Sequence, residues 1–163
     1  MSIVIDTPVM EDLIKDFGKF KCIVDYLNMK VISIYIPYTL ERQYKNVVNI
    51  KCVDLSREIR NIGYRVSIVR IPKSKEDSIK KRYSSLLENV ENAISSKRHS
   101  GSDDAVIITC AVVQAKNHSK KFIVIAKQYH VEHYRNAKHV IERELKTRTC
   151  WFNVIDINDI IQY

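Results

Sequence analysis

The residues most able to do chemistry in this chain are three widely spaced acids, Asp6, Glu41 and Asp104. Carboxylates that are brought together repel each other unless a cation neutralises them. Hard oxygen ligands of this kind favour Mg²⁺ or Mn²⁺. A metal ion held by them can activate water and stabilise the charge of an in-line phosphoryl displacement. If the fold gathers the three side chains, they therefore predict a metal site that hydrolyses phosphodiesters.

Short strands that alternate with helices must position these acids. Apolar and β-branched runs predict strands at residues 3–6, 31–36, 64–71, 122–126 and 151–157. Helical spacing predicts helices between them, among them one long helix that carries the apolar residues 79–94, while Thr7 is a predicted N-cap before Pro8. This alternation predicts an α/β fold, a central parallel sheet of about five strands with helices on both faces.

The predicted sheet gives the three acids a common location. Ligands of parallel sheets bind beyond the carboxyl ends of the strands. Asp6 lies at that end of the first strand, Glu41 follows the second, and Asp104 opens the helix that leads to the fourth. We therefore expect all three carboxylates to converge at one edge of the sheet, within about one coordination shell.

The charge of the chain is concentrated in one segment. Residues 42–82 hold 12 Lys and Arg against 4 Asp and Glu, whereas the rest of the chain holds 15 of each, for a net charge of +8. Such a segment suits a polyanion, most simply nucleic acid, although a solvated lysine-rich surface would give the same count.

The order and spacing of these features resemble the PIN-domain family of metal-dependent ribonucleases over nearly the whole chain, 1–163. The resemblance rests on Ile3-Val-Ile-Asp6-Thr7, on Ile36-Pro-Tyr-Thr-Leu-Glu41, on Ser102-Asp-Asp104-Ala105 and on the strand 122–126. It implies a single PIN-like domain and an endoribonuclease whose catalytic metal ligands, for Mg²⁺ or Mn²⁺, are Asp6, Glu41 and Asp104. It also implies that Thr7 supports the site by hydrogen bonding.

The chain departs from the family pattern at two positions. Pro8 replaces the usual small polar residue, and Gln128 stands where the fourth family acid would fall. Asp103, His130 and Glu132 are the neighbouring residues that could substitute for this acid. A single histidine is more often structural than a ligand, so His130 and His133 are weaker candidates than the acids.

The basic segments beside two of the acids are predicted to hold the RNA backbone. They contain Arg42 and Lys45, and Lys97 and Arg98. Such contacts position single-stranded RNA without reading its sequence. Because no apolar run approaches the ~20 residues of a membrane span and the start lacks the form of a signal peptide, the sequence predicts a cytoplasmic protein without membrane association. It leaves open a homodimer and a regulatory protein partner.

Two other functions compete with the nuclease. The first is a catalytically weak or inactive PIN-like module that binds RNA or a partner protein, and the replacement of the fourth acid by Gln128 favours it. The second, a receiver-type phosphoacceptor, requires an acid at the end of the third strand. The chain reads Val69-Arg-Ile-Pro72 there, without an acid, which argues against this function. A phosphate-binding loop of the GxGxxG or GxxxxGK[ST] type does not occur in the sequence, which argues against a nucleotide-binding fold.

Overall fold

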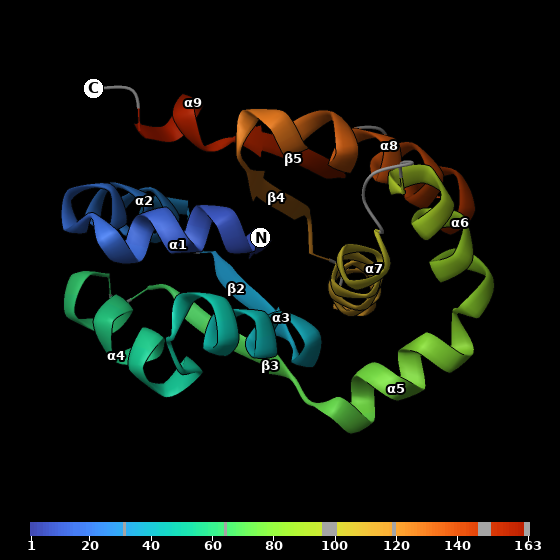
Figure 1. The fold of residues 1–163 in the computed structure, drawn as a ribbon, viewed down its shortest axis with the longest axis horizontal. Helices are drawn as coiled ribbons and strands as arrows, with labels where there is room; N and C mark the ends of the chain where they lie inside the picture. The colour runs from blue at the N-terminus through green and yellow to red at the C-terminus, as the bar shows by residue number, and fades with distance from the viewer. Residues whose placement is uncertain (31, 64, 96–100, 119, 147–150, 162–163) are drawn as a thin grey trace.

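One parallel sheet lies at the centre of the fold (Figure 1). The computed structural model describes residues 1–30, 32–63, 65–95, 101–118, 120–146 and 151–161. Within these ranges, five strands pair in the order β3-β2-β1-β4-β5. The strands are β1 (Ser2–Ile5), β2 (Ser33–Pro37), β3 (Ser67–Ile71), β4 (Phe122–Ala126) and β5 (Phe152–Asp156). The predicted α/β class, with a parallel sheet of about five strands, is confirmed.

Burial increases from the edges of the sheet to its middle. β1 and β4 are buried along their whole length, whereas β3, an edge strand, exposes Ser67 and Arg70. Ile3 lies in register with Ile34 of β2 and Ile123 of β4. Strands covered on both faces are expected to be continuous apolar runs, and the sequence of β1 and β4 fits that rule.

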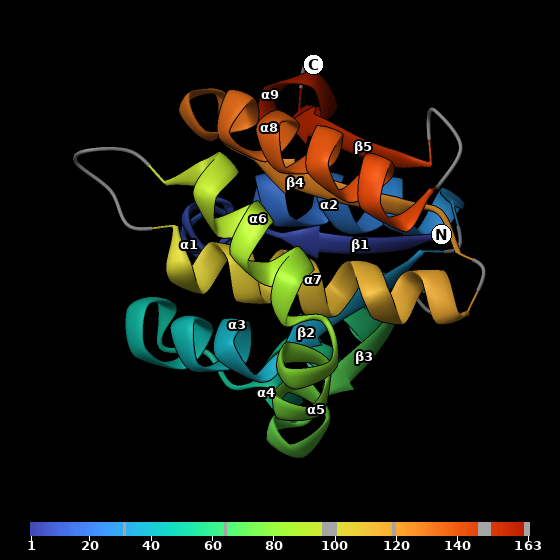
Figure 2. The same cartoon turned by 90° about the vertical axis from the view of Figure 1, so that its right-hand side faces the viewer.

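Helices cover both faces of the sheet, and Figure 2 shows α6, α7 and α8 in front of it. One face carries α1 (Thr7–Lys15), α2 (Phe17–Lys30) and α4 (Cys52–Ile62). The other face carries α5 (Lys73–Arg82), α6 (Ser84–Ile94), α7 (Ser102–Asn117) and α8 (Gln128–Leu145). The remaining helices are α3 (Tyr38–Gln43), the π-helix η1 (Tyr44–Val48) and α9 (Ile157–Ile161). No helix in the described ranges is long and apolar enough to span a membrane.

The prediction of one long helix over residues 79–94 is wrong. Tyr83 has φ −111° and ψ 34°, outside the helical region, and separates α5 from α6. Each half packs on a different set of partners, because α5 contacts α3 and α7 whereas α6 contacts α7 and α8. The apolar spacing of the sequence continues through Tyr83, so it could not indicate this break.

Candidate functional site

Asp6 lies where the connections of the sheet diverge. It directly follows β1 and is the N-cap of α1, and its backbone N–H donates to the carbonyl oxygen of Ile125 in β4 at 3.0 Å. From β1 the chain crosses to β2 over one face of the sheet, and from β4 it crosses to β5 by way of α8 on the other. This divergence is the topological switch point at which open α/β sheets bind their ligands.

Two side chains of α8 hold the Asp6 carboxylate. Tyr134 donates its hydroxyl to Oδ1 at 2.7 Å, and Nδ1 of His130 lies 3.0 Å from Oδ2. His130 and Tyr134 are four residues apart, so they project from the same side of the helix. Asp6 is only 5% exposed, and the two partners therefore compensate much of the desolvation of its charge.

Asp104, in the first turn of α7, joins the same group of side chains. Its Oδ2 lies 3.4 Å from Nε2 of His133, and the rings of His133 and His130 have centroids 5.7 Å apart. We refer to Asp6, Asp104, His130, His133 and Tyr134 as the Asp–His cluster. The cluster joins the end of β1 to the first turn of α7 and the first two turns of α8.

The electrostatics of the Asp–His cluster follow from its two carboxylates. The hydrogen bond to Asp6 raises the pKa of His130, against its partial burial, and the charges of Asp6 and Asp104 raise it further. Burial raises the pKa of Tyr134 well above its usual value, and both carboxylates add to that shift. Because each carboxylate acts on both residues, Asp6 and Asp104 belong to one electrostatic environment.

Glu41 has its contacts elsewhere. Its Oε1 lies 2.5 Å from a guanidinium nitrogen of Arg70 on β3. Burial first, and then the charge and hydrogen bonding of Glu41, raise the pKa of the Cys52 thiol to about 11. Glu41 thus faces β3 and the start of α4, whereas the contacts of Asp6 and Asp104 lie with α8.

The described residues contain no group of three or more His, Cys, Asp or Glu side chains arranged to hold a metal ion. The contacts bring Asp6 and Asp104 into one cluster and engage Glu41 with Arg70. The three-acid coordination shell expected from the sequence therefore remains a prediction.

Thr7 has a different role from the predicted N-cap. It is the first helical residue of α1, Asp6 takes the cap position, and the Thr7 hydroxyl donates to Oε1 of Gln43 at 2.5 Å. One residue further on, the hydroxyl of the buried Tyr44 donates to the backbone carbonyl of Ile5. These two bonds tie α3 and η1 to the end of β1, beside Asp6. The Thr7 hydrogen bond therefore joins the start of α1 to α3, and its support of a metal site stays a prediction.

The other predicted site residues lie in different parts of the chain. Asp103 and Gln128 are both exposed, at the starts of α7 and α8. Arg42 and Lys45 line a hollow of about 520 Å³ whose wall also contains Glu41 and the cations Arg70 and Lys73. The predicted contacts Lys97 and Arg98 lie outside the described residues.

The sequence pattern did not predict that Tyr134 donates a hydrogen bond to the carboxylate of Asp6. Its position fits the apolar stripe of the predicted last helix, which accounts for its burial but not for its hydrogen bond. The available signal was the spacing of His130, His133 and Tyr134 at i, i+3 and i+4, directly after a buried strand. Polar groups at this spacing form one helical face at the ligand-binding edge of the sheet.

A scan against protein-family models, a search of curated proteins and a search of solved structures each found no match to this chain.

Proposed function

We propose that the protein is a metal-dependent endoribonuclease of the PIN-like class, which hydrolyses phosphodiester bonds of single-stranded RNA. The observation that carries the proposal is the buried carboxylate of Asp6 at the topological switch point, in one cluster with Asp104. The resemblance in order and spacing to that family adds the reaction and the RNA substrate.

In this proposal, Asp6 and Asp104 would form part of a Mg²⁺ or Mn²⁺ site. Mg²⁺ in enzymes is usually held by one or two protein carboxylates, with water and substrate phosphate as its other ligands. Asp6 and Asp104 are the pair that would hold it, and Glu41 is the third ligand that the family resemblance implies. The ion would supply Lewis-acid stabilisation of charge on the phosphate.

The remaining residues have roles that follow from their contacts. His130 and Tyr134 fix the orientation of the Asp6 carboxylate, so that it is preorganised before any ligand binds. Arg42 and Lys45 lie on an open basic hollow and are the groups that would hold the RNA backbone.

The test is cleavage of a fluorescent single-stranded RNA with added Mn²⁺ or Mg²⁺ and, separately, with EDTA. We expect endonucleolytic products with either metal, none with EDTA, and none from Asp6→Asn or Asp104→Asn. Asp25→Asn removes an exposed carboxylate of α2 and is the matched control that should cut like the wild type. Cleavage that persists in EDTA, or in both site variants, contradicts the proposal.

A binding module without catalysis is the second candidate, and the ion pair between Glu41 and Arg70 favours it. An acid held by an arginine at 2.5 Å is not disposed to ligate a metal, and Gln128 adds no charge. This candidate predicts RNA binding of equal strength by the wild type and by Asp6→Asn, with no cleavage by either protein in Mn²⁺ or Mg²⁺. That pair of results would replace the nuclease with the binding module.

A further inference from the structure

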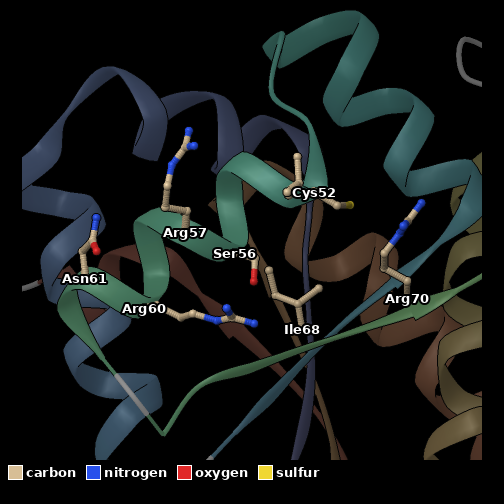
Figure 3. Close-up of a pocket in the computed structure, with 8 residues that line it drawn as sticks. Cys52, Ser56, Arg57, Arg60, Asn61, Ile68 and Arg70 are labelled. Carbon is tan, nitrogen blue, oxygen red and sulfur yellow. The ribbon is translucent and has the colours of Figure 1, made fainter.

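An arginine-lined hollow opens between α4 and the edge strand β3, separate from the Asp–His cluster (Figure 3). It has a volume of about 550 Å³, in the range of small-molecule sites. Its lining consists of Cys52, Val53, Ser56, Arg57, Arg60, Asn61, Ile68 and Arg70. The hollow therefore combines three guanidinium groups with small polar and apolar groups, and none of these residues is an acid.

The local structure accounts for this lining. Residues of a strand that are two apart project to the same face, so Ile68 and Arg70 both face the hollow from β3. On α4, Leu55 and Ile59 are buried while Arg57 and Arg60 remain exposed. The hollow is thus bounded by the polar side of an amphipathic helix and by one face of an edge strand.

The three arginines differ in how far their charge is already neutralised. Arg57 pairs with Asp54 at 3.0 Å, and Arg70 pairs with Glu41 at 2.5 Å. Arg60 makes no ion pair or side-chain hydrogen bond in the described part of the chain. Its guanidinium is therefore the cation of the hollow that is most available to an incoming anion.

The groups next to Arg60 suit a phosphate that carries an organic part. In Figure 3 the guanidinium of Arg60 and the hydroxyl of Ser56 both lie beside Ile68, in the angle between α4 and β3. A planar guanidinium binds phosphate oxygens in pairs, and a hydroxyl can donate to a third oxygen. Ile68 and Val53, which is 69% exposed, offer apolar surface to a sugar or base.

The hollow shares one lining residue with the hollow next to Glu41. Arg70 lines both this hollow and the one that contains Arg42, Lys45 and Lys73. Cys52 does not oppose an anion there, because a thiol whose pKa is raised to about 11 is neutral at physiological pH. Arg70, paired with Glu41, thus stands between Arg60 in this hollow and Arg42 in the next.

We propose that the hollow between α4 and β3 binds one nucleotide unit of single-stranded RNA, with its phosphate on Arg60 and Ser56 and its apolar part on Val53 and Ile68. The site lies outside the cluster that would cut the strand. The identity of the ligand rests on the proposed function, because RNA is the substrate given there. Binding at the hollow requires neither metal nor cleavage.

The experiment measures binding of fluorescent single-stranded RNA by anisotropy in EDTA over a range of salt concentrations. Loss of one phosphate contact lowers the slope of log K against log salt by about 0.7 for a single strand. We expect Arg60→Ala to show that lower slope and to weaken binding about tenfold at low salt. Arg60→Lys should show an intermediate loss, because lysine keeps the charge but lacks the bidentate guanidinium. Arg143→Ala is the matched control, since it removes an exposed helical arginine from α8.

The outcomes are separable. Equal affinities and equal slopes for Arg60→Ala and Arg143→Ala overturn the proposal. Competition by inorganic phosphate and by a nucleoside monophosphate distinguishes the ligands. If either small anion binds in an Arg60-dependent manner while RNA binding does not depend on Arg60, the hollow is a small-anion site and the RNA assignment is wrong. If RNA binding depends on Arg60 but Mn²⁺ and Mg²⁺ give no cleavage, the inference stands and the nuclease proposal fails.

Discussion

Replacing Tyr134 by Phe removes a single oxygen atom, the hydroxyl that donates to Oδ1 of Asp6 at 2.7 Å. Tyr134 is 3% exposed and Asp6 is 5% exposed, so water cannot readily take the place of the lost donor. A hydrogen bond to a charged group contributes about 1.5–3 kcal/mol to the free energy of unfolding. We expect Tyr134→Phe to lower that free energy by this amount and, for a chain of this length, to lower Tm by about 3–12 °C.

Tyr44→Phe is the matched control, because Tyr44 is also a buried tyrosine. Its hydroxyl donates to the neutral backbone carbonyl of Ile5. A bond between neutral groups contributes about 0.5–1.5 kcal/mol, so Tyr44→Phe should cost less than Tyr134→Phe. The difference between the two variants isolates the effect of the charge on Asp6.

The assay is equilibrium urea unfolding in EDTA of the wild type, both tyrosine variants, Asp6→Asn and the double variant of positions 6 and 134. The two substitutions should be non-additive, because both remove the same hydrogen-bonded pair. Equal costs for the two tyrosine variants, or strict additivity in the double variant, would refute the assignment of Tyr134 as the charge-assisted donor to Asp6.

Three further predictions concern other contacts. His130→Ala should destabilise the protein most below pH 6.5, because the bond to Asp6 raises the pKa of His130 in the folded state. The cost should shrink as pH rises through that folded-state pKa. A cost in urea unfolding that does not change with pH contradicts this. Glu76→Gln should lower the free energy of unfolding by about 1.5–3 kcal/mol, measured by calorimetry. The reason is that this buried carboxylate accepts hydrogen bonds from the Thr39 backbone N–H at 2.9 Å and from the Thr39 hydroxyl. An unchanged Tm refutes this prediction. Tyr129 is 67% exposed, and its ring centroid lies 4.4 Å from that of His130, so we expect it to stack on an RNA base. Tyr129→Ala should therefore weaken RNA binding by about 5- to 150-fold, whereas Tyr129→Phe should not. Equal anisotropy curves for both variants exclude the stacking.

The sequence pattern predicted the elements of the sheet well, for a physical reason. Strands such as 122–126 are continuous β-branched and apolar runs, and burial on both faces requires that composition. The pattern located Asp6 at the end of β1 and Asp104 at the start of α7, because both positions follow from element boundaries alone. The sequence pattern therefore predicted the backbone position of each acid.

The contacts of these acids could not be read in the same way. Glu41 pairs with Arg70, which lies 29 residues further along the chain, and nothing in the local sequence of either residue indicates a partner. The break at Tyr83 was equally hidden, because it arises from the different partners of α5 and α6. Spacing reports which face of an element is apolar, whereas side-chain partners depend on how distant elements meet.

The distance along the chain between Asp6 and its partners has a consequence for biosynthesis. Asp6 is separated by 124 residues from His130 and by 128 from Tyr134, and β1 likewise pairs with β4 at the far end of the sequence. A ribosome delivers the N-terminal segment first, so the carboxylate of Asp6 must remain hydrated until α8 has been made. Long-range parallel pairing of this kind also slows folding. The Asp–His cluster therefore cannot assemble on a nascent chain that lacks α8, and we expect any activity that depends on the cluster to begin only after α8 has left the ribosome.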